Sequence, residues 1–129
     1  MKRAGILNPD LAAGLARLGH TDAVVVGDCG LPRPPGVVVV DLALVAGVPT
    51  FEQVVRALAE EIVVETAVVA SEASVANPGV VDLVTELFGA PTTVRHEEFK
   101  AASAGARLFV RTGEATPYAN VILRCGVPF

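Results

Sequence analysis

The fold of this chain is decided by the segment Ala23-Val24-Val25-Val26-Gly27-Asp28, a run of valines that ends at a glycine and a carboxylate. Consecutive valines leave no polar face, which is typical of a strand buried on both sides in a parallel sheet. Residues 29–36 follow and are rich in proline and glycine, so they form a loop. Val37 to Val40 repeat the valine pattern. They predict a second strand of the same sheet.

A helix is expected immediately before the first strand. Asn8 can cap its amino end, and Pro9 suits its first position because proline lacks the N–H that would be unpaired there. Apolar residues at helical spacing follow as far as Leu18, and Gly19 ends the helix. His20 therefore falls in a short connection that is held by regular structure on both sides.

The rest of the chain continues the alternation of helices and strands. Thr50 and Gln53 have the spacing of a capping box, and a stripe of apolar residues follows at helical spacing. Strands are expected at 62–70, interrupted by Glu65, and at 92–95, 108–111 and 120–123; helices are expected at 78–88 and 97–104. This pattern predicts the α/β class, as a single domain over residues 1–129 with three α/β/α layers around a mainly parallel or mixed sheet. It does not give the strand order.

The composition limits the kinds of partner that the protein can bind. Apolar residues make up 52% of the 129 residues and charged residues only 19%. A domain of this size has a high ratio of surface to volume, so we expect part of its apolar surface to be covered in a homo-oligomer. A valine-rich monomeric core is the alternative. The net charge of −4 and the scattered basic residues argue against nucleic acid, which needs a basic face.

The sequence lacks the motifs that are typical of several other classes of protein. No apolar run approaches the length of about 18 residues that a membrane-spanning helix needs, and Asn8 interrupts any signal peptide that Lys2 and Arg3 could begin. A cytoplasmic protein is therefore expected. There is no glycine-rich phosphate loop, catalytic-serine elbow or metal-binding histidine motif, so neither a cofactor nor a metal is expected. Cys29 and Cys125 are expected to be small buried side chains without a disulfide.

Two positions near the first strand are candidates for chemistry. His20 is one of only two histidines, and the tight turn Gly19-His20-Thr21-Asp22 could aim its side chain. Asp28 follows the carboxyl end of a strand, where ligands of α/β sheets tend to bind. Each also has an ordinary interpretation, since His20 could be a surface histidine and Asp28 could merely cap the following turn.

Further candidates lie toward the carboxyl end of the chain. His96 and Lys100 are four residues apart, so on a helix they would share one face. Tyr118 and Asn120 follow a turn and offer a hydroxyl and an amide, which suit a ligand with many hydroxyl groups. Both groups could equally be ordinary surface residues, and their spacing does not decide between the two interpretations.

Short segments along the whole chain form an ordered series. The segments are Gly5-Ile6-Leu7-Asn8, Leu18-Gly19-His20-Thr21-Asp22, Gly27-Asp28-Cys29-Gly30-Leu31-Pro32, Gly47-Val48-Pro49-Thr50-Phe51, His96-Glu97-Glu98-Phe99-Lys100, Arg111-Thr112-Gly113-Glu114 and Pro117-Tyr118-Ala119-Asn120-Val121-Ile122-Leu123. Together they resemble the D-ribose pyranase family and its relatives, the L-fucose mutarotases. The chain differs from the family at two places. Cys29 stands where alanine is expected, and the segment of residues 77–93 is shorter than in longer members.

The resemblance implies an isomerase that interconverts the pyranose and furanose forms of D-ribose by opening and closing the ring, supplying furanose for phosphorylation. It implies that His20 is the proton donor, that no cofactor or metal takes part, and that five or ten chains form a ring. The implied substrate-binding residues are Asp28, His96, Lys100, Tyr118, Ala119 and Asn120, of which Ala119 contributes backbone groups only. One placed acid–base group accelerates such a reaction by about 10²–10⁴-fold.

Two other functions remain open from the sequence. The chain could be a mutarotase of the L-fucose type, although the Gly-Leu-Pro after Asp28 and the Pro-Tyr-Ala-Asn around Tyr118 favour the ribose branch. It could also be a sugar-binding ring without catalysis. Such a ring would need Asp28, Tyr118 and Asn120 but not His20.

Overall fold

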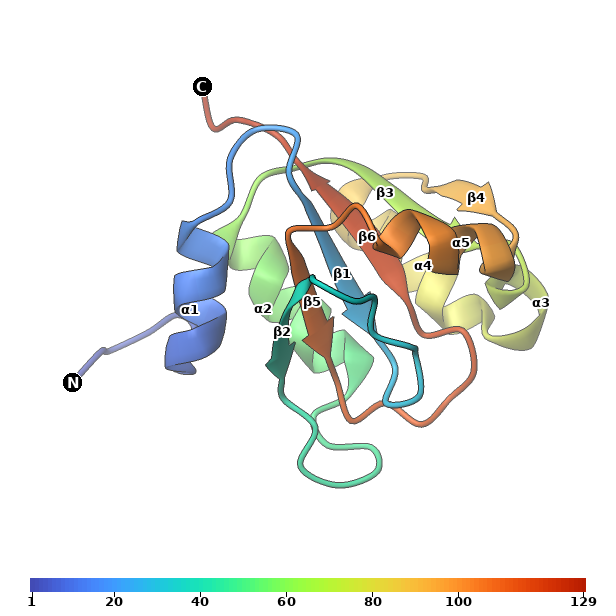
Figure 1. Cartoon of the computed structure of the whole chain (residues 1–129), viewed down its shortest axis with the longest axis horizontal. Coiled ribbons are helices and arrows are strands. Elements are labelled where there is room, and N and C mark those ends of the chain that lie inside the picture. Colours follow the sequence, from blue (N-terminus) through green and yellow to red (C-terminus); the bar gives the residue numbers. More distant parts are fainter.

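Six strands form one mixed sheet between helices, as Figure 1 shows. The computed structural model describes residues 1–129. Across the sheet, the strands are β2 (Val38–Asp41), β5 (Leu108–Arg111), β1 (Ala23–Gly27), β6 (Val121–Cys125), β3 (Val64–Ala70) and β4 (Thr92–Val94). The helices are α1 (Pro9–Ala16), α2 (Phe51–Glu61), α3 (Ala73–Ala76), α4 (Pro78–Phe88) and α5 (His96–Ser103).

The strands run in one direction, with a single exception. β5 pairs in parallel with β1 and β2, and β3 pairs in parallel with β4, whereas β6 is antiparallel to both of its neighbours, β1 and β3. The parallel strands therefore all end on one side of the sheet, called the carboxyl end below; the opposite side is the amino end. The prediction of a mainly parallel or mixed sheet between helices is confirmed.

β1 is the central element of the core. Val24, Val25 and Val26 are all completely buried, because β1 lies between β5 and β6 and is covered on both faces. Successive side chains of a strand point to opposite faces. Val24 and Val26 accordingly belong to the larger hydrophobic cluster, and Val25 belongs to a smaller one on the other face.

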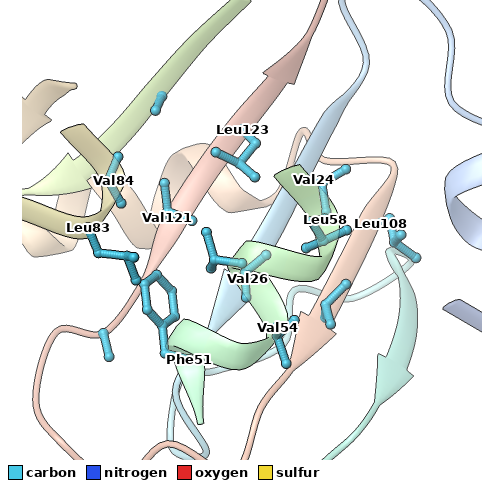
Figure 2. Packing of buried hydrophobic residues seen from close by; sticks show 14 of the residues in the cluster. Val24, Val26, Phe51, Val54, Leu58, Leu83, Val84, Leu108, Val121 and Leu123 are labelled. Carbon is cyan, nitrogen blue, oxygen red and sulfur yellow. The ribbon is translucent and has the colours of Figure 1, made fainter. Parts of the chain in front are cut away.

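The two faces of the sheet are covered unequally. Phe51, Val54 and Leu58 of helix α2 belong to the larger cluster. They pack there with Val24 and Val26 of β1 (Figure 2). The opposite cluster has only six buried residues, and Phe99 of α5 is one of them. The buried Phe99 fixes α5 on the sheet. Helix α5 is thus placed by packing, with His96 as its first residue.

The local signals for α2 and α4 are confirmed. The Thr50 hydroxyl accepts a hydrogen bond from the Gln53 N–H at 3.1 Å, and the Gln53 side chain accepts one from the Thr50 N–H at 2.9 Å, which completes the capping box. Helix α4 begins at Pro78 and is capped at its end by Gly89, as the sequence predicts.

Other boundaries differ from the expectation. Helix α1 ends at Ala16 rather than Leu18, because Gly19 instead donates its N–H to the Asp22 carboxylate at 2.8 Å in a separate turn. The short helix α3 was not expected, and β6 runs to Cys125, two residues beyond the predicted end. In β3, the ladder shifts register between Val64 and Thr66, which is the interruption predicted at Glu65.

The two cysteines lie at opposite ends of the sheet and are both free. Cys125 is buried at the end of β6, and burial raises the pKa of its thiol, with a further contribution from Asp22. Cys29 is only half-buried, so the expectation that it is buried is wrong. It lies in the loop after β1, where its carbonyl accepts a hydrogen bond from Arg111 Nε at 3.0 Å. None of the helices has the length and apolar composition needed to cross a bilayer.

Leu58→Ala tests the packing of α2 on the sheet. Leu58 is completely buried, so its truncation should lower the free energy of unfolding by about 2–5 kcal/mol through lost burial and a residual cavity. Glu60→Ala is the matched control, because Glu60 is exposed on the same helix and should change stability by less than about 0.5 kcal/mol. Urea unfolding at one protein concentration measures both. Equal losses in the two variants would contradict the packing described.

Candidate active site

Most of the polar residues singled out from the sequence meet at the carboxyl end of the sheet. Asp28 follows β1, and His96 follows β4 after one intervening residue. The segment 118–120 leads into β6, which begins at this same end because it runs antiparallel to the other strands. Ligands of open α/β sheets bind outside the carboxyl ends of the strands.

Asp28 and Asn120 form a reciprocal pair. The Asp28 N–H donates to Asn120 Oδ1 at 2.8 Å, and Asn120 Nδ2 donates to Asp28 Oδ2 at 2.9 Å. Asn120 is completely buried, whereas Asp28 is half-buried. The other oxygen of Asp28, Oδ1, accepts from the Gly30 N–H at 2.9 Å. Asp28 therefore does cap the following turn, and the buried amide of Asn120 also fixes its orientation.

His96 and Tyr118 form the second part of the group. Their rings meet edge to face with centroids 5.1 Å apart, and His96 also stacks on the buried Phe99. Tyr118 has a φ of +57°, a conformation that non-glycine residues seldom adopt. Nδ1 of His96 is buried and has no hydrogen-bond partner within the chain.

The short segment from Tyr118 to Asn120 joins the two parts. At one end Tyr118 contacts His96, and at the other end Asn120 holds Asp28. Ala119 between them is completely buried and leaves only backbone groups for a ligand. Asp28, His96, Tyr118 and Asn120 thus form one continuous group, called the carboxyl-end group below.

Lys100 lies one turn after His96 on the same helix. Its ammonium group is 2.7 Å from the carboxylate of Glu97, and this hydrogen bond is the main reason that the pKa of Glu97 is lowered. Lys100 is thus one helical turn from His96, and its charge is engaged by Glu97.

His20 lies at the other end of the sheet. It precedes β1, whereas Asp28 follows it, so the whole length of the strand separates them, as the positions of the two connections in Figure 1 show. At about 3.3 Å per residue, the strand alone accounts for roughly 15 Å. The structure therefore does not bring His20 together with the carboxyl-end group of the same chain.

The surroundings of His20 are open. Its side chain is 52% exposed, and its Nε2 lies 3.7 Å from the Glu65 carboxylate, a distance and exposure at which an ion pair contributes little. Beside it is a hollow of about 500 Å³, lined among others by Leu15, Val63 and the carboxyl-terminal Phe129. His20 is thus accessible from outside the chain.

One carboxylate in contact with this group was missed from the sequence. Glu72 follows the carboxyl end of β3 and accepts the backbone N–H of His96, at 2.9 Å and 3.1 Å for its two oxygens. The signal that favoured Asp28, a carboxylate just beyond a strand, is also present at Glu72. No group of three or more His, Cys, Asp or Glu side chains is arranged to hold a metal ion.

Comparison with known proteins identifies the family. The model of the RbsD / FucU transport protein family matches residues 1–128. The chain belongs to this family. The family resemblance predicted from the sequence is thereby confirmed.

Individual members of the RbsD/FucU family are similar over the full chain. A protein of Streptomyces coelicolor named D-ribose pyranase is 58% identical over 129 residues, which is 100% of both chains. The structure of Bacillus subtilis RbsD complexed with D-ribose is 46% identical with a TM-score of 0.95, again over 100% of both chains. The fucose mutarotase of Streptococcus pneumoniae in complex with L-fucose covers 100% of both chains, but at 21% identity its TM-score of 0.81 shows the fold alone.

Asn120→Ala tests the reciprocal pair. It should leave the Asp28 N–H and one carboxylate oxygen without partners in a half-buried place, at a cost of about 1–3 kcal/mol in the free energy of unfolding. Asn120→Asp should also destabilise, because it would set a second carboxylate against that of Asp28. Urea unfolding at neutral pH measures both variants. Wild-type stability of Asn120→Asp would show that the pair does not form.

Proposed function

We propose that this chain interconverts the pyranose and furanose forms of D-ribose by acid–base catalysed opening and closing of the ring. The observation that carries the proposal is the carboxyl-end group, in a chain 46% identical over its whole length to RbsD complexed with D-ribose. The D-ribose pyranase of Streptomyces coelicolor, at 58% identity, supports the same activity. We place this activity in the cytoplasm, where free thiols remain reduced.

The carboxyl-end group offers what a sugar needs. The carboxylate of Asp28 can accept hydrogen bonds from sugar hydroxyls, and the Tyr118 hydroxyl and the His96 imidazole add further hydrogen-bonding positions. Asn120 keeps Asp28 in place, and the edge-to-face contact keeps His96 and Tyr118 in place. Because these groups are held before the sugar arrives, little ordering remains to oppose binding. Lys100 would reach the sugar only by leaving Glu97.

The proton donor in this proposal is His20 of a neighbouring copy of the chain. A distance of roughly 15 Å along β1 prevents His20 from acting on a sugar bound at the carboxyl end of its own chain. The half-exposed imidazole is free to face a second chain. The site is therefore completed only when the amino end of one chain meets the carboxyl end of the next.

Exposed apolar side chains at both ends of the sheet support such a contact. Phe129, near His20, is 99% exposed, and Leu44, in the loop between β2 and α2 at the carboxyl end, is 77% exposed. Val45 and Val48 are exposed in the same loop. A contact between two different surfaces of the same chain is head-to-tail, and it closes into a ring when the rotation allows. This assembly suits the apolar excess of the composition.

The chemistry follows from one positioned proton carrier. Opening the pyranose breaks the bond between C1 and the ring oxygen O5, while the hydroxyl on C1 loses its proton and O5 gains one. The resulting aldehyde rotates, and the hydroxyl on C4 attacks C1, with the two proton transfers reversed. A histidine can give and take protons near neutral pH, so His20 can give a proton to O5 in the first half and take one from the C4 hydroxyl in the second. Water takes the proton of the C1 hydroxyl when the pyranose opens and returns one when the furanose closes. The carboxyl-end group holds the sugar so that these oxygens face the His20 imidazole.

His20→Ala should abolish most of the catalysis while ribose still binds. The half-exposed side chain fills no core, so the free energy of unfolding should change by about 1 kcal/mol or less. The rate of exchange between ring forms should fall by on the order of 10²-fold, because the proton carrier is lost. Saturation-transfer NMR on ribose with catalytic amounts of protein measures the rate, and a ribose titration measures the affinity.

His96→Ala is the contrasting variant, because it should weaken ribose binding at least as much as the rate. Near-normal exchange in His20→Ala with loss of exchange in His96→Ala would reverse the roles of the two histidines. Line broadening without faster exchange in the wild-type protein would indicate a sugar-binding ring without catalysis. Faster exchange with L-fucose than with ribose would instead indicate a fucose mutarotase.

Mixing the two variants tests whether neighbouring chains share the site. In oligomers formed from equal amounts of His20→Ala and His96→Ala chains, about a quarter of the contacts pair an intact His20 with an intact His96. Exchange should therefore recover to about a quarter of the wild-type rate after the two variants are unfolded and refolded together. Each variant refolded alone is the control. No recovery, in oligomers shown by mass spectrometry to contain both chains, would place His20 outside the shared site.

A further inference from the structure

The segment from Ser71 to Asn77, which includes helix α3, connects the two sides of the carboxyl-end group. These sides are the rings of His96 and Tyr118, called the two aromatic walls below. It leaves β3 at the carboxyl end and leads into α4. Its first turn is hydrogen-bonded to the start of α5 through Glu72, and its last residue, Asn77, is hydrogen-bonded to the loop that precedes Tyr118.

Glu72 holds the amino end of α5. Arg95, the N-cap residue of that helix, makes no side-chain capping bond, and both carboxylate oxygens of Glu72 accept the N–H of His96 instead. A carboxylate is favoured here by the positive end of the helix. Hydrogen bonds from two backbone N–H groups, its own first and that of His96 second, lower the pKa of Glu72, so the carboxylate stays charged at neutral pH. The backbone that carries the His96 imidazole is thus fixed by Glu72.

Asn77 holds the other wall. Its Nδ2 donates to the Thr116 hydroxyl and to the Pro117 carbonyl, both at 2.9 Å. Tyr118 comes next in the chain and has the left-handed φ of +57°. Such a backbone conformation persists only where the surrounding contacts impose it. The bond from Asn77 to the Pro117 carbonyl acts on the peptide group directly before Tyr118.

The two walls meet where the sugar is proposed to bind. The His96 and Tyr118 rings are 5.1 Å apart at an interplanar angle of 82°. We propose that Glu72 and Asn77 are positioning residues for the sugar, with Glu72 acting through His96 and Asn77 acting through Tyr118. This inference rests on the proposed function, because it assigns both residues to the same site.

The surroundings of Glu72 and Asn77 separate this role from general support of the fold. Neither side chain belongs to a hydrophobic cluster, and both are partly exposed. Their replacement opens no cavity in the core, so most of the effect should fall on the site. Replacement of a residue with a purely structural role would lower the stability of the protein without a specific effect on His96 or Tyr118.

Glu72→Ala should weaken ribose affinity by on the order of tenfold, the value of one charge-assisted hydrogen bond. Glu72→Gln keeps an oxygen that can accept the His96 N–H and should recover part of the loss. Glu98→Gln is the matched control, since Glu98 lies on the exposed face of α5, the helix that begins at His96, and pairs with Arg95. It removes the same charge and should leave affinity unchanged.

A double-mutant cycle identifies the residue through which Glu72 acts. In a His96→Ala background, Glu72→Ala should weaken ribose affinity by less than about twofold, because the group that it positions is gone. Asn77→Ala in a Tyr118→Ala background should behave in the same way. The histidine side-chain NMR signals of ligand-free Glu72→Gln provide a readout independent of activity. The His96 signals should shift and those of His20 should not.

The results that overturn the inference are distinct from those that overturn the function. Additive losses in both cycles, or unshifted His96 signals, would reject positioning even where wild-type exchange is fast. Wild-type protein that does not accelerate exchange would reject the proposed function, while a shift confined to His96 would still support the link from Glu72. If Glu72→Ala does not fold, the cycle is run with Glu72→Gln, and additivity there rejects the inference equally.

Discussion

The burial of β1 on both faces is the constraint on which the rest of the structure depends. Three consecutive valines without exposed surface require helices or loops on both sides of the sheet, and the unequal clusters around Val24 and Val25 meet this requirement. A strand that is held so completely has fixed ends. The polar residues just beyond those ends, His20 and Asp28, therefore occupy defined positions at opposite ends of the sheet.

The reversed direction of β6 builds the carboxyl-end group. A parallel strand in the same place would begin at the amino end and carry the segment before it away from Asp28. Because β6 is antiparallel to β1 and β3, residues 118–120 enter the sheet beside the points where these strands finish. Asn120 can then bond to Asp28, and Tyr118 can contact His96. One strand reversal thus joins residues more than 90 positions apart in the sequence, since Asp28 and Asn120 are separated by 92.

The same geometry gives assembly a chemical role in the proposed function. In a monomer, His20 would stay roughly 15 Å from a sugar bound at the carboxyl end of its own chain and would contribute nothing to catalysis. A head-to-tail contact would cover exposed apolar residues at both ends and bring His20 to the carboxyl-end group of a neighbour. Catalysis would then require the oligomer. This would account for the exposure of Leu44 and Phe129 in the single chain.

The sequence by itself determined most of the helices and strands, apart from α3, and the polar residues at their ends, because caps, glycine stops and valine runs act over a few residues. The capping box at Thr50, the start of α4 at Pro78 and the strand before Asp28 are all local in this sense. The family resemblance named the candidate residues but did not say which of them share a site in one chain. Only the tertiary structure decided the strand order, the reversal of β6, the separation of His20 and the contact of Glu72 with His96. These depend on pairing between distant segments, for which no local pattern carries a signal.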